Sequence, residues 1–295
     1  MASRRPGGCR FLTPTNPTLV TDAQAGRLHV VSTPIGNLGD ITLRAIETLR
    51  GVTAILAEDT RHSRHLLIRH GITTPVEAYH EHNEARQAPR IVARLLEGQS
   101  FALISDAGTP VLSDPGARLV RAAIEAGIGV SPVPGPSALL AALAASGVDA
   151  DRFTFFGFLP RKGRERVEAL DALVALPHTA VLYEAANRVG DTLRDIAAQG
   201  GGGRHVVVAR EMTKQFEEFR RGTVDELAEY YGESTPKGEV VIVLGGVAPA
   251  PLDEGALREH AQRLRAGGAS TRDIVRLLVE DHHAPRNLAY RIAHE

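Results

Sequence analysis

The sequence LISDAGTPVLSDPG, residues 103–116, decides how the first half of this chain is interpreted. Its apolar start belongs to the segment FALIS (101–105), which predicts a buried strand, and a loop of small and polar residues follows. Such a loop can hold a metal, cradle a phosphate, or receive a polar small molecule against its backbone. The segments around it discriminate among these three uses.

Apolar segments alternate with segments of helical periodicity on both sides of this loop. Strands are predicted at 28–33, 51–59, 76–80, 101–105 and 129–135, and helices at 41–50, 60–71, 85–96 and 117–127. The strands are almost continuously apolar, which is typical of a parallel sheet covered by helices on both faces. A helix rich in small residues, predicted over 136–147, leads into the second half.

The second half shows a different pattern. Strands are predicted at 153–158, 179–185, 205–211, 216–222 and 238–246, and helices at 164–175, 187–199 and 224–231. Only MTKQ separates the third strand from the fourth, which indicates a hairpin and hence a mixed sheet. Two or three short helices are expected after the proline-rich segment 248–255. The predicted fold class is therefore α/β: a parallel-sheet domain, a mixed-sheet domain and a small C-terminal helical extension.

Length and composition are consistent with this division. The 295 residues, 43% hydrophobic and 23% charged, are ordinary for a globular protein of two domains. We expect a disordered extension at 1–26, an N-terminal α/β domain at 27–138, a C-terminal α/β domain at 139–247 and the helical extension at 252–295. No apolar run approaches the roughly 20 residues that span a bilayer, so no membrane association is expected.

Charge and cysteine content exclude some classes of protein. The single cysteine, Cys9, excludes a disulfide framework and a cysteine-rich zinc site, and it fits a reducing cytoplasm. The net charge is −1, so any contact with nucleic acid has to come from local basic patches.

Polar or glycine-containing loops follow every strand of the first half. These loops are TPIGN (33–37), EDTR (58–61), HEHNE (80–84), SDAGTP (105–110) and PGPSA (134–138). Open parallel sheets bind ligands outside the carboxyl ends of their strands, so these loops are expected to line one cleft. Neither a Walker loop nor a G-x-G-x-x-G fingerprint occurs. Asp106 and Asp114 have no third carboxylate close in sequence, so we expect no metal, and residues 114–116 are expected to start the next helix.

Several motifs together carry a resemblance. They are VVSTPIGNLGDITLRAIETL, AEDTRHSRHLL, LISDAGTPVLSDPG, VPGPSALLAALAASG, FGFLPRKGRER, LYEAANR, VVVAREMTKQFEEFRRGT and GEVVIVLGG, in this order. The chain thereby resembles the tetrapyrrole-methylase-like family, and within it the members that methylate a cytidine ribose 2′-hydroxyl in the decoding centre of 16S rRNA. The resemblance implies two α/β domains with S-adenosylmethionine between them, a homodimer, and a target on the assembled small ribosomal subunit.

The resemblance also implies a set of cofactor-binding residues. Carried over motif by motif, they are Pro34, Gly36, Asp106, Ala107, Gly108, Thr109, Ser137, Ala138, Tyr183, Met212, Gly238 and Glu239. Small residues let the backbone approach the ligand, and Asp106 would favour the cationic end of S-adenosylmethionine. The alternative for Asp106 is an aspartate that caps a turn.

A ribose hydroxyl is a poor nucleophile, so a base or a positive neighbour should assist the transfer. The candidates are Asp59, Glu184, Glu211 and Lys214. Asp59 has the alternative of capping the helix that starts at residue 60, and Glu211 that of pairing with an arginine.

Two basic segments are candidates for RNA binding. The first segment contains Arg61 and Arg64, and the second contains Arg161, Lys162 and Arg164. The alternative is that both are solvated, charged surfaces. Two other functions stay open: a methyltransferase of the same fold acting on a tetrapyrrole, and a noncatalytic RNA-binding or ribosome assembly factor. The basic segments and the helical extension favour RNA.

Overall fold

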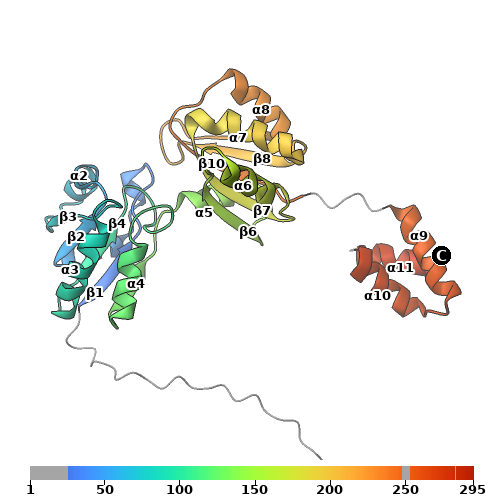
Figure 1. Cartoon of the computed structure of the whole chain (residues 1–295), viewed down its shortest axis with the longest axis horizontal. Helices are drawn as coiled ribbons and strands as arrows, with labels where there is room; N and C mark the ends of the chain where they lie inside the picture. Colours follow the sequence, from blue (N-terminus) through green and yellow to red (C-terminus); the bar gives the residue numbers. More distant parts are fainter. Residues whose placement is uncertain (1–25, 248–252, 283) are drawn as a thin grey trace, which may run out of the picture. The chain divides into compact units, whose positions relative to one another are not determined.

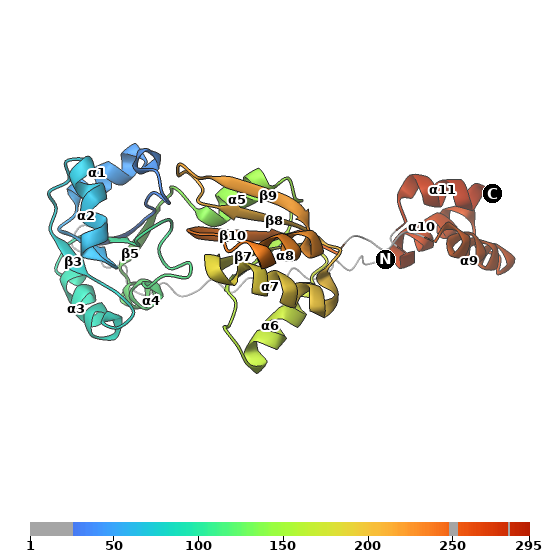
Figure 2. The same cartoon turned by 90° about the horizontal axis from the view of Figure 1, so that it is seen from above.

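A computed structural model describes residues 26–247, 253–282 and 284–295. Most of the extension predicted at 1–26 lies outside the described residues. The chain forms two compact units, the first ending at Gly246 and the second beginning at Val247. The first unit contains two five-stranded sheets (Figures 1 and 2), so the prediction of two α/β domains is confirmed.

The first sheet is entirely parallel, as predicted. Its strands are β1 (Arg27–Val31), β2 (Ala54–Ala57), β3 (Val76–Ala78), β4 (Phe101–Ile104) and β5 (Gly129–Val133), in the order β3-β2-β4-β1-β5. All residues of β2 and β4 are buried because helices cover both faces of the sheet.

Alternate strand residues enter two separate cores. On one face, α1 (Leu43–Gly51) and α2 (Thr60–Arg69) pack against the sheet. On the other face, α3 (Glu84–Leu96) and α4 (Ala117–Glu125) do so. The carboxyl ends of the strands are therefore left free to carry loops.

The second sheet is mixed, as the short connection between its third and fourth strands predicts. Its strands are β6 (Phe153–Phe158), β7 (Thr179–Ala185), β8 (His205–Arg210), β9 (Glu218–Thr223) and β10 (Glu239–Leu244), in the order β6-β7-β10-β8-β9. Only β6 and β7 pair in parallel; the other three pairs are antiparallel.

Helices cover both faces of the second sheet. One face packs against α6 (Arg164–Val174), α7 (Val189–Ile196) and α8 (Val224–Glu233). The other face packs against α5 (Ala138–Ser146), and Ile35 from the loop after β1 joins this core. We propose that the second domain begins with α5.

Two helix limits differ from the sequence prediction for local reasons. The helix predicted from residue 136 begins at Ala138, because the Ser137 hydroxyl accepts a hydrogen bond from the Leu140 amide and caps it. The helix predicted at 187–199 is divided: α7 ends at Ile196, and Gly200 has a φ of 89° within the π-helical segment that follows.

The described residues of the second compact unit form three helices, in agreement with the two or three predicted. They are α9 (Glu254–Ala266), α10 (Thr271–His282) and α11 (Arg286–His294). Their apolar faces form a core of their own, with Leu257, Leu278 and Ile292 almost fully buried. Among the described residues, no helix is long and apolar enough to cross a membrane.

Candidate functional site

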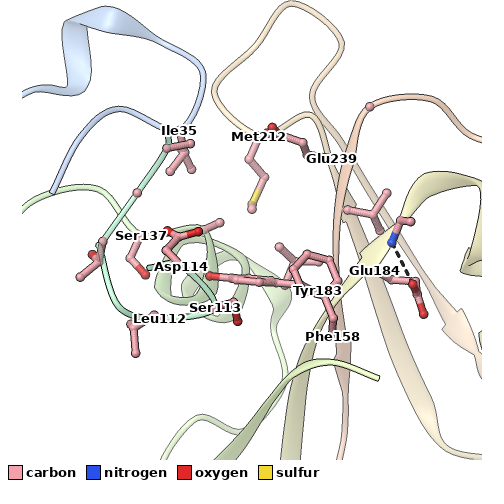
Figure 3. Close-up of a pocket in the computed structure, with 18 residues that line it drawn as sticks. Ile35, Leu112, Ser113, Asp114, Ser137, Phe158, Tyr183, Glu184, Met212 and Glu239 are labelled. Atoms are coloured by element: carbon pink, nitrogen blue, oxygen red, sulfur yellow. Dashed lines mark hydrogen bonds between the residues drawn. The ribbon is translucent and has the colours of Figure 1, made fainter. Parts of the chain in front are cut away.

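The largest group of predicted cofactor residues meets in one cavity. This first cavity has a volume of about 330 Å³ and lies where the loop after β4 faces the ends of β7 and β10 (Figure 3). Nine of the twelve predicted cofactor residues line it: Ala107, Gly108, Thr109, Ser137, Ala138, Tyr183, Met212, Gly238 and Glu239.

A second cavity, of about 250 Å³, adjoins the first. It is lined by the other three predicted cofactor residues, Pro34, Gly36 and Asp106. Ile35, Ala107 and Glu239 line both cavities. The structure thus brings all twelve residues to two neighbouring hollows that share a wall.

Hydrogen bonds join the loops that follow β1 and β4. The amides of Thr33 and Gly108 each donate to the carbonyl of the other, with N···O distances of 2.8 and 3.0 Å. The Thr33 hydroxyl also donates to the Ser105 carbonyl at 3.2 Å. Gly108 has a φ of 79°, a conformation that side chains disfavour, so its lack of a side chain permits this pairing.

Backbone strain gathers in the two loops beside the cavities. Within the described chain, the residues other than glycine with positive φ are Val111 (77°), Ser113 (67°), Glu211 (49°) and Thr213 (66°). Such a conformation is unfavourable, above all for a β-branched valine. Strain of this kind persists only where surrounding contacts impose it, and it is common at functional sites.

The Asp106 carboxylate is held by a hydrogen bond from the backbone of the loop after β2. Its Oδ1 accepts a hydrogen bond from the backbone amide of Asp59 at 3.0 Å. Glu58 lies close enough that the charges of Asp106 and Asp114 contribute, after burial, to raising its pKa. Glu58, Asp106 and Asp114 are therefore neighbours in the fold, although Glu58 is distant from the other two in sequence. The described residues contain no group of three or more candidate metal ligands.

Asp59 occupies neither cavity. Its carboxylate caps α2, accepting a hydrogen bond from the Arg61 amide at 2.8 Å. Hydrogen bonds from the Arg61 side chain and backbone lower the pKa of Asp59 to about 2. The capping role weighed for Asp59 is the one that the structure shows, and its side chain is not placed to serve as a base in either cavity.

Glu184 lies beside the first cavity, but its carboxylate is turned into the protein (Figure 3). Its side chain is fully buried, with Oε2 accepting from the Thr192 hydroxyl at 2.5 Å and Oε1 from the Ala185 amide at 2.9 Å. The Arg188 guanidinium lies 3.4 Å from Oε1. This geometry favours a structural role over the predicted catalytic one.

We therefore expect Glu184→Ala to affect stability more than turnover. Removing one partner of a buried ion pair costs about 3–5 kcal/mol, because Arg188 and Thr192 lose their acceptor. Urea denaturation should show this loss, while the methyl-transfer rate per folded molecule stays near that of the wild type. A large loss of rate in fully folded protein would restore Glu184 as a catalytic candidate.

Lys214 is a cation held between two carboxylates. Its Nζ lies 2.9 Å from Oε1 of Glu211 and 2.9 Å from Oε2 of Glu239. Burial acts to lower the pKa of Lys214, but hydrogen bonds to these carboxylates outweigh it and raise the pKa. Lys214 lines the second cavity as a charged group, not as a base. Glu211 forms its ion pair with this lysine and not with an arginine.

Of the described residues that line the first cavity, Asp114 is the one ionisable residue that is not among the predicted site residues. Residues 114–116 lead into α4 as expected, since the helix begins at Ala117 with Gly116 as its N-cap residue, but no side chain caps it, so Asp114 does not have that role. The strained backbone at 111 and 113 turns the loop so that Asp114 lines the first cavity (Figure 3). Burial raises the pKa of Asp114, a hydrogen bond from Ser105 opposes this, and the charge of Asp106 adds to it.

The predicted RNA-binding residues are exposed on two segments near the cavities. Arg61 and Arg64 are exposed on α2, whose His62, Ser63 and His65 line the second cavity. Arg161, Lys162 and Arg164 are exposed in the segment after β6, whose last residue, Phe158, lines the first cavity. Two of these residues form surface ion pairs, Arg61 with Asp59 and Arg164 with Glu168.

Solved structures share this architecture. The methyltransferase CobJ matches with a TM-score of 0.60 and 18% identity, over 76% of this chain and 95% of CobJ. Uroporphyrin-III C-methyltransferase from Thermus thermophilus, complexed with S-adenosyl homocysteine, matches with a TM-score of 0.56 and 18% identity, over 75% and 97% of the two chains. At these identities the likeness shows the fold.

Sequence comparison is more specific. The model of the tetrapyrrole (corrin/porphyrin) methylases matches residues 27–228. Two proteins named ribosomal RNA small subunit methyltransferase I are close relatives. The one from Synechocystis sp. is 46% identical over 92% of this chain and 98% of its own length. The one from Mesorhizobium japonicum is 52% identical over 78% of each chain. With its two cavities and this degree of identity, the chain belongs to the tetrapyrrole methylases, in the ribosomal RNA small subunit methyltransferase I family.

Proposed function

We propose that this enzyme methylates the ribose 2′-hydroxyl of a decoding-centre cytidine in 16S rRNA, with S-adenosylmethionine as the methyl donor. The observation that carries the proposal is the convergence of nine predicted cofactor residues on the first cavity. Relatives that match nearly the whole chain are named for the RNA of the small ribosomal subunit, which supports this class of acceptor.

The first cavity fits S-adenosylmethionine in size and chemistry. Its volume of about 330 Å³ lies within the roughly 300–1,000 Å³ of small-molecule sites. Apolar side chains such as Met212 and Tyr183 offer surface to an adenine ring. Amides at the start of α5, after Ser137, are free to donate hydrogen bonds, and Asp106 next to the cavity complements a positive charge.

The chemistry needs a group that accepts one proton. When bound, S-adenosylmethionine supplies a methyl group that leaves sulfur for the acceptor oxygen, so that a C–S bond breaks, an O–C bond forms and the hydroxyl proton is released. We propose Asp114 as the base, since its half-buried carboxylate lines the first cavity and burial raises its pKa. Asp59 and Glu184 are committed to other contacts, and Lys214 carries a proton already.

One assay separates the candidate functions. Purified protein is incubated with labelled S-adenosylmethionine and with small ribosomal subunits, naked 16S rRNA or a porphyrinoid. Label in the ribose of a single cytidine is the expected result. Label only in the porphyrinoid would indicate a small-molecule methyltransferase of the same fold. Binding of the donor without transfer to any of them would indicate a noncatalytic RNA-binding or assembly factor.

The proposal also includes the oligomeric state of the enzyme and its location in the cell. We propose a homodimer, on the resemblance described above, and a location in the cytoplasm, where small ribosomal subunits are assembled. If the enzyme is a homodimer, light scattering coupled to gel filtration should give the mass of two 31.6 kDa chains.

The basic segment after β6 should contribute to RNA affinity through phosphate contacts. We expect the Arg161→Ala, Lys162→Ala double variant to bind small subunits more weakly and with a shallower salt dependence. Each lost contact should reduce the slope of log K against log salt by about 0.7–0.9. Arg152→Ala removes an exposed arginine from just before β6 and is the matched control. An unchanged slope in filter-binding titrations would show that the segment does not contact phosphate.

A further inference from the structure

The second cavity is distinct in character from the first. Buried hydroxyl-bearing residues line it, namely Thr33, Ser63 and Ser105, and two exposed histidines, His62 and His65, form one wall. These histidines lie one helical turn apart on α2, so both belong to the same face of the helix. Neither imidazole forms a hydrogen bond to another described residue. The wall is thus free to contact a ligand.

The volume of the second cavity and its position beside the first cavity restrict which ligand it can bind. A volume of about 250 Å³ lies below the roughly 300–1,000 Å³ of sites for drug-sized molecules, so it suits one nucleoside and not a folded segment of RNA. Because Ile35, Ala107 and Glu239 line both cavities, a group in the second cavity lies directly beside the first. A methyl acceptor has to occupy such a position to be in reach of the donor.

The lining of the second cavity includes the acidic residues Asp106 and Glu239, but basic residues that suit the phosphates of the acceptor RNA lie beside it on α2. Arg61 and Arg64 are exposed on the same helix as the two histidines, and α2 contains no acidic residue. Arg64 forms no ion pair with the described residues, so its charge is available to a phosphate. Imidazole rings are among the groups on which proteins stack unpaired RNA bases.

We propose that the second cavity receives the base of the acceptor nucleoside, extruded from the rRNA and contacted by His62 and His65. The ribose 2′-hydroxyl then lies at the wall shared with the first cavity, which Asp114 lines. The inference rests on the proposed function and specifies its substrate site. Extrusion is the general means by which a protein reaches one nucleotide within a folded nucleic acid. Lys214 also lines this cavity, and its ammonium group is paired with the carboxylates of Glu211 and Glu239.

Two variants test the cavity without touching the first one. His62→Ala, His65→Ala removes the proposed contacts, and Leu38→Trp places a large ring at a partly exposed position that lines the second cavity only. We expect the double variant to raise KM for small subunits at least tenfold, and Leu38→Trp to abolish transfer. Calorimetry with S-adenosylhomocysteine should give wild-type affinity in both. His205→Ala, an exposed histidine at the start of β8, is the matched control.

The outcomes are separable. An equal loss of S-adenosylhomocysteine affinity and of activity would assign the second cavity to the methyl donor and overturn the inference. An unchanged KM in folded double variant, together with normal turnover of Leu38→Trp, would also overturn it. If the wild type transfers no label to small subunits or naked rRNA, the proposed function itself fails, whatever the variants do.

Discussion

Asp114→Asn is expected to lower the turnover of methyl transfer by about 10²–10⁴-fold, the usual contribution of a general base. The asparagine has nearly the same shape as the aspartate and keeps one side-chain oxygen as an acceptor, so the loop should keep its form. What it loses is the ability to take the proton that the ribose hydroxyl releases. Single-turnover rates with small subunits would measure the effect, and S-adenosylhomocysteine affinity should fall little.

The dependence on pH gives an independent check of Asp114. Burial raises its pKa above the ordinary value of 3.8, and the base is inactive when protonated. The wild-type rate should therefore fall as the pH drops through this raised pKa, and the asparagine variant should lack that limb. A variant that keeps both the rate and the acidic limb would exclude Asp114 as the base.

Stability should change in the opposite direction. The folded protein binds the Asp114 proton more tightly than the unfolded chain does, so stability contributed by this group is lost as the pH rises from about 3.8 through the raised pKa. Asp114→Asn should thus be more resistant to urea than the wild type at pH 7. This advantage should vanish at a pH below 3.8, where the carboxyl is protonated in both states. Such an exchange of stability for activity is common at active sites.

The fold was predictable because its signals are local and repeated. Continuous apolar strands alternating with helices specify a covered parallel sheet, and the four-residue connection MTKQ specifies the antiparallel pair β8 and β9. Strands β6 and β7 have the predicted bounds, whereas others are shorter than predicted, for instance β2 at Ala54–Ala57 within 51–59.

The cofactor residues were predictable for a different reason. The motifs predict which loop each residue belongs to, and the topology of a parallel sheet predicts that these loops lie along one edge of the sheet. The motifs do not predict which way each side chain points. In a strand, successive side chains point to opposite faces, so Tyr183 at the cavity implies that Glu184 points away. That signal was present in the sequence and could have removed Glu184 from the list of bases.

Asp114 could not have been found in this way. The triplet Asp-Pro-Gly before a helical segment is typical of a helix start, and local patterns alone support that interpretation. Its position depends instead on Val111 and Ser113 adopting positive φ, which long-range contacts impose against local preference. The same loop passes close to β4: a Cβ at Gly116 would lie 2.6 Å from Leu103 Cδ2, so only glycine fits there.

Asp106→Asn is expected to weaken the binding of S-adenosylmethionine by about 10–150-fold, which corresponds to the loss of roughly 1.5–3 kcal/mol from a charged hydrogen bond. The physical reason is that Asp106 places a carboxylate at the wall of the second cavity, beside the first, where a cationic ligand end can pair with it. The alternative role, fixing the loop by accepting from the Asp59 amide at 3.0 Å, survives in asparagine. The substitution therefore separates charge from loop geometry.

Asp106→Ala completes the comparison, since it removes both the charge and the acceptor for the Asp59 amide. Calorimetry with S-adenosylmethionine should show similar losses for the two variants if charge dominates. If only the alanine variant loses affinity, Asp106 shapes the loop and the donor's positive charge is met elsewhere. Unchanged affinity in both would remove Asp106 from the site. Because Asp106 lines the second cavity and not the first, a loss in both variants would also mean that the bound donor extends to their shared wall.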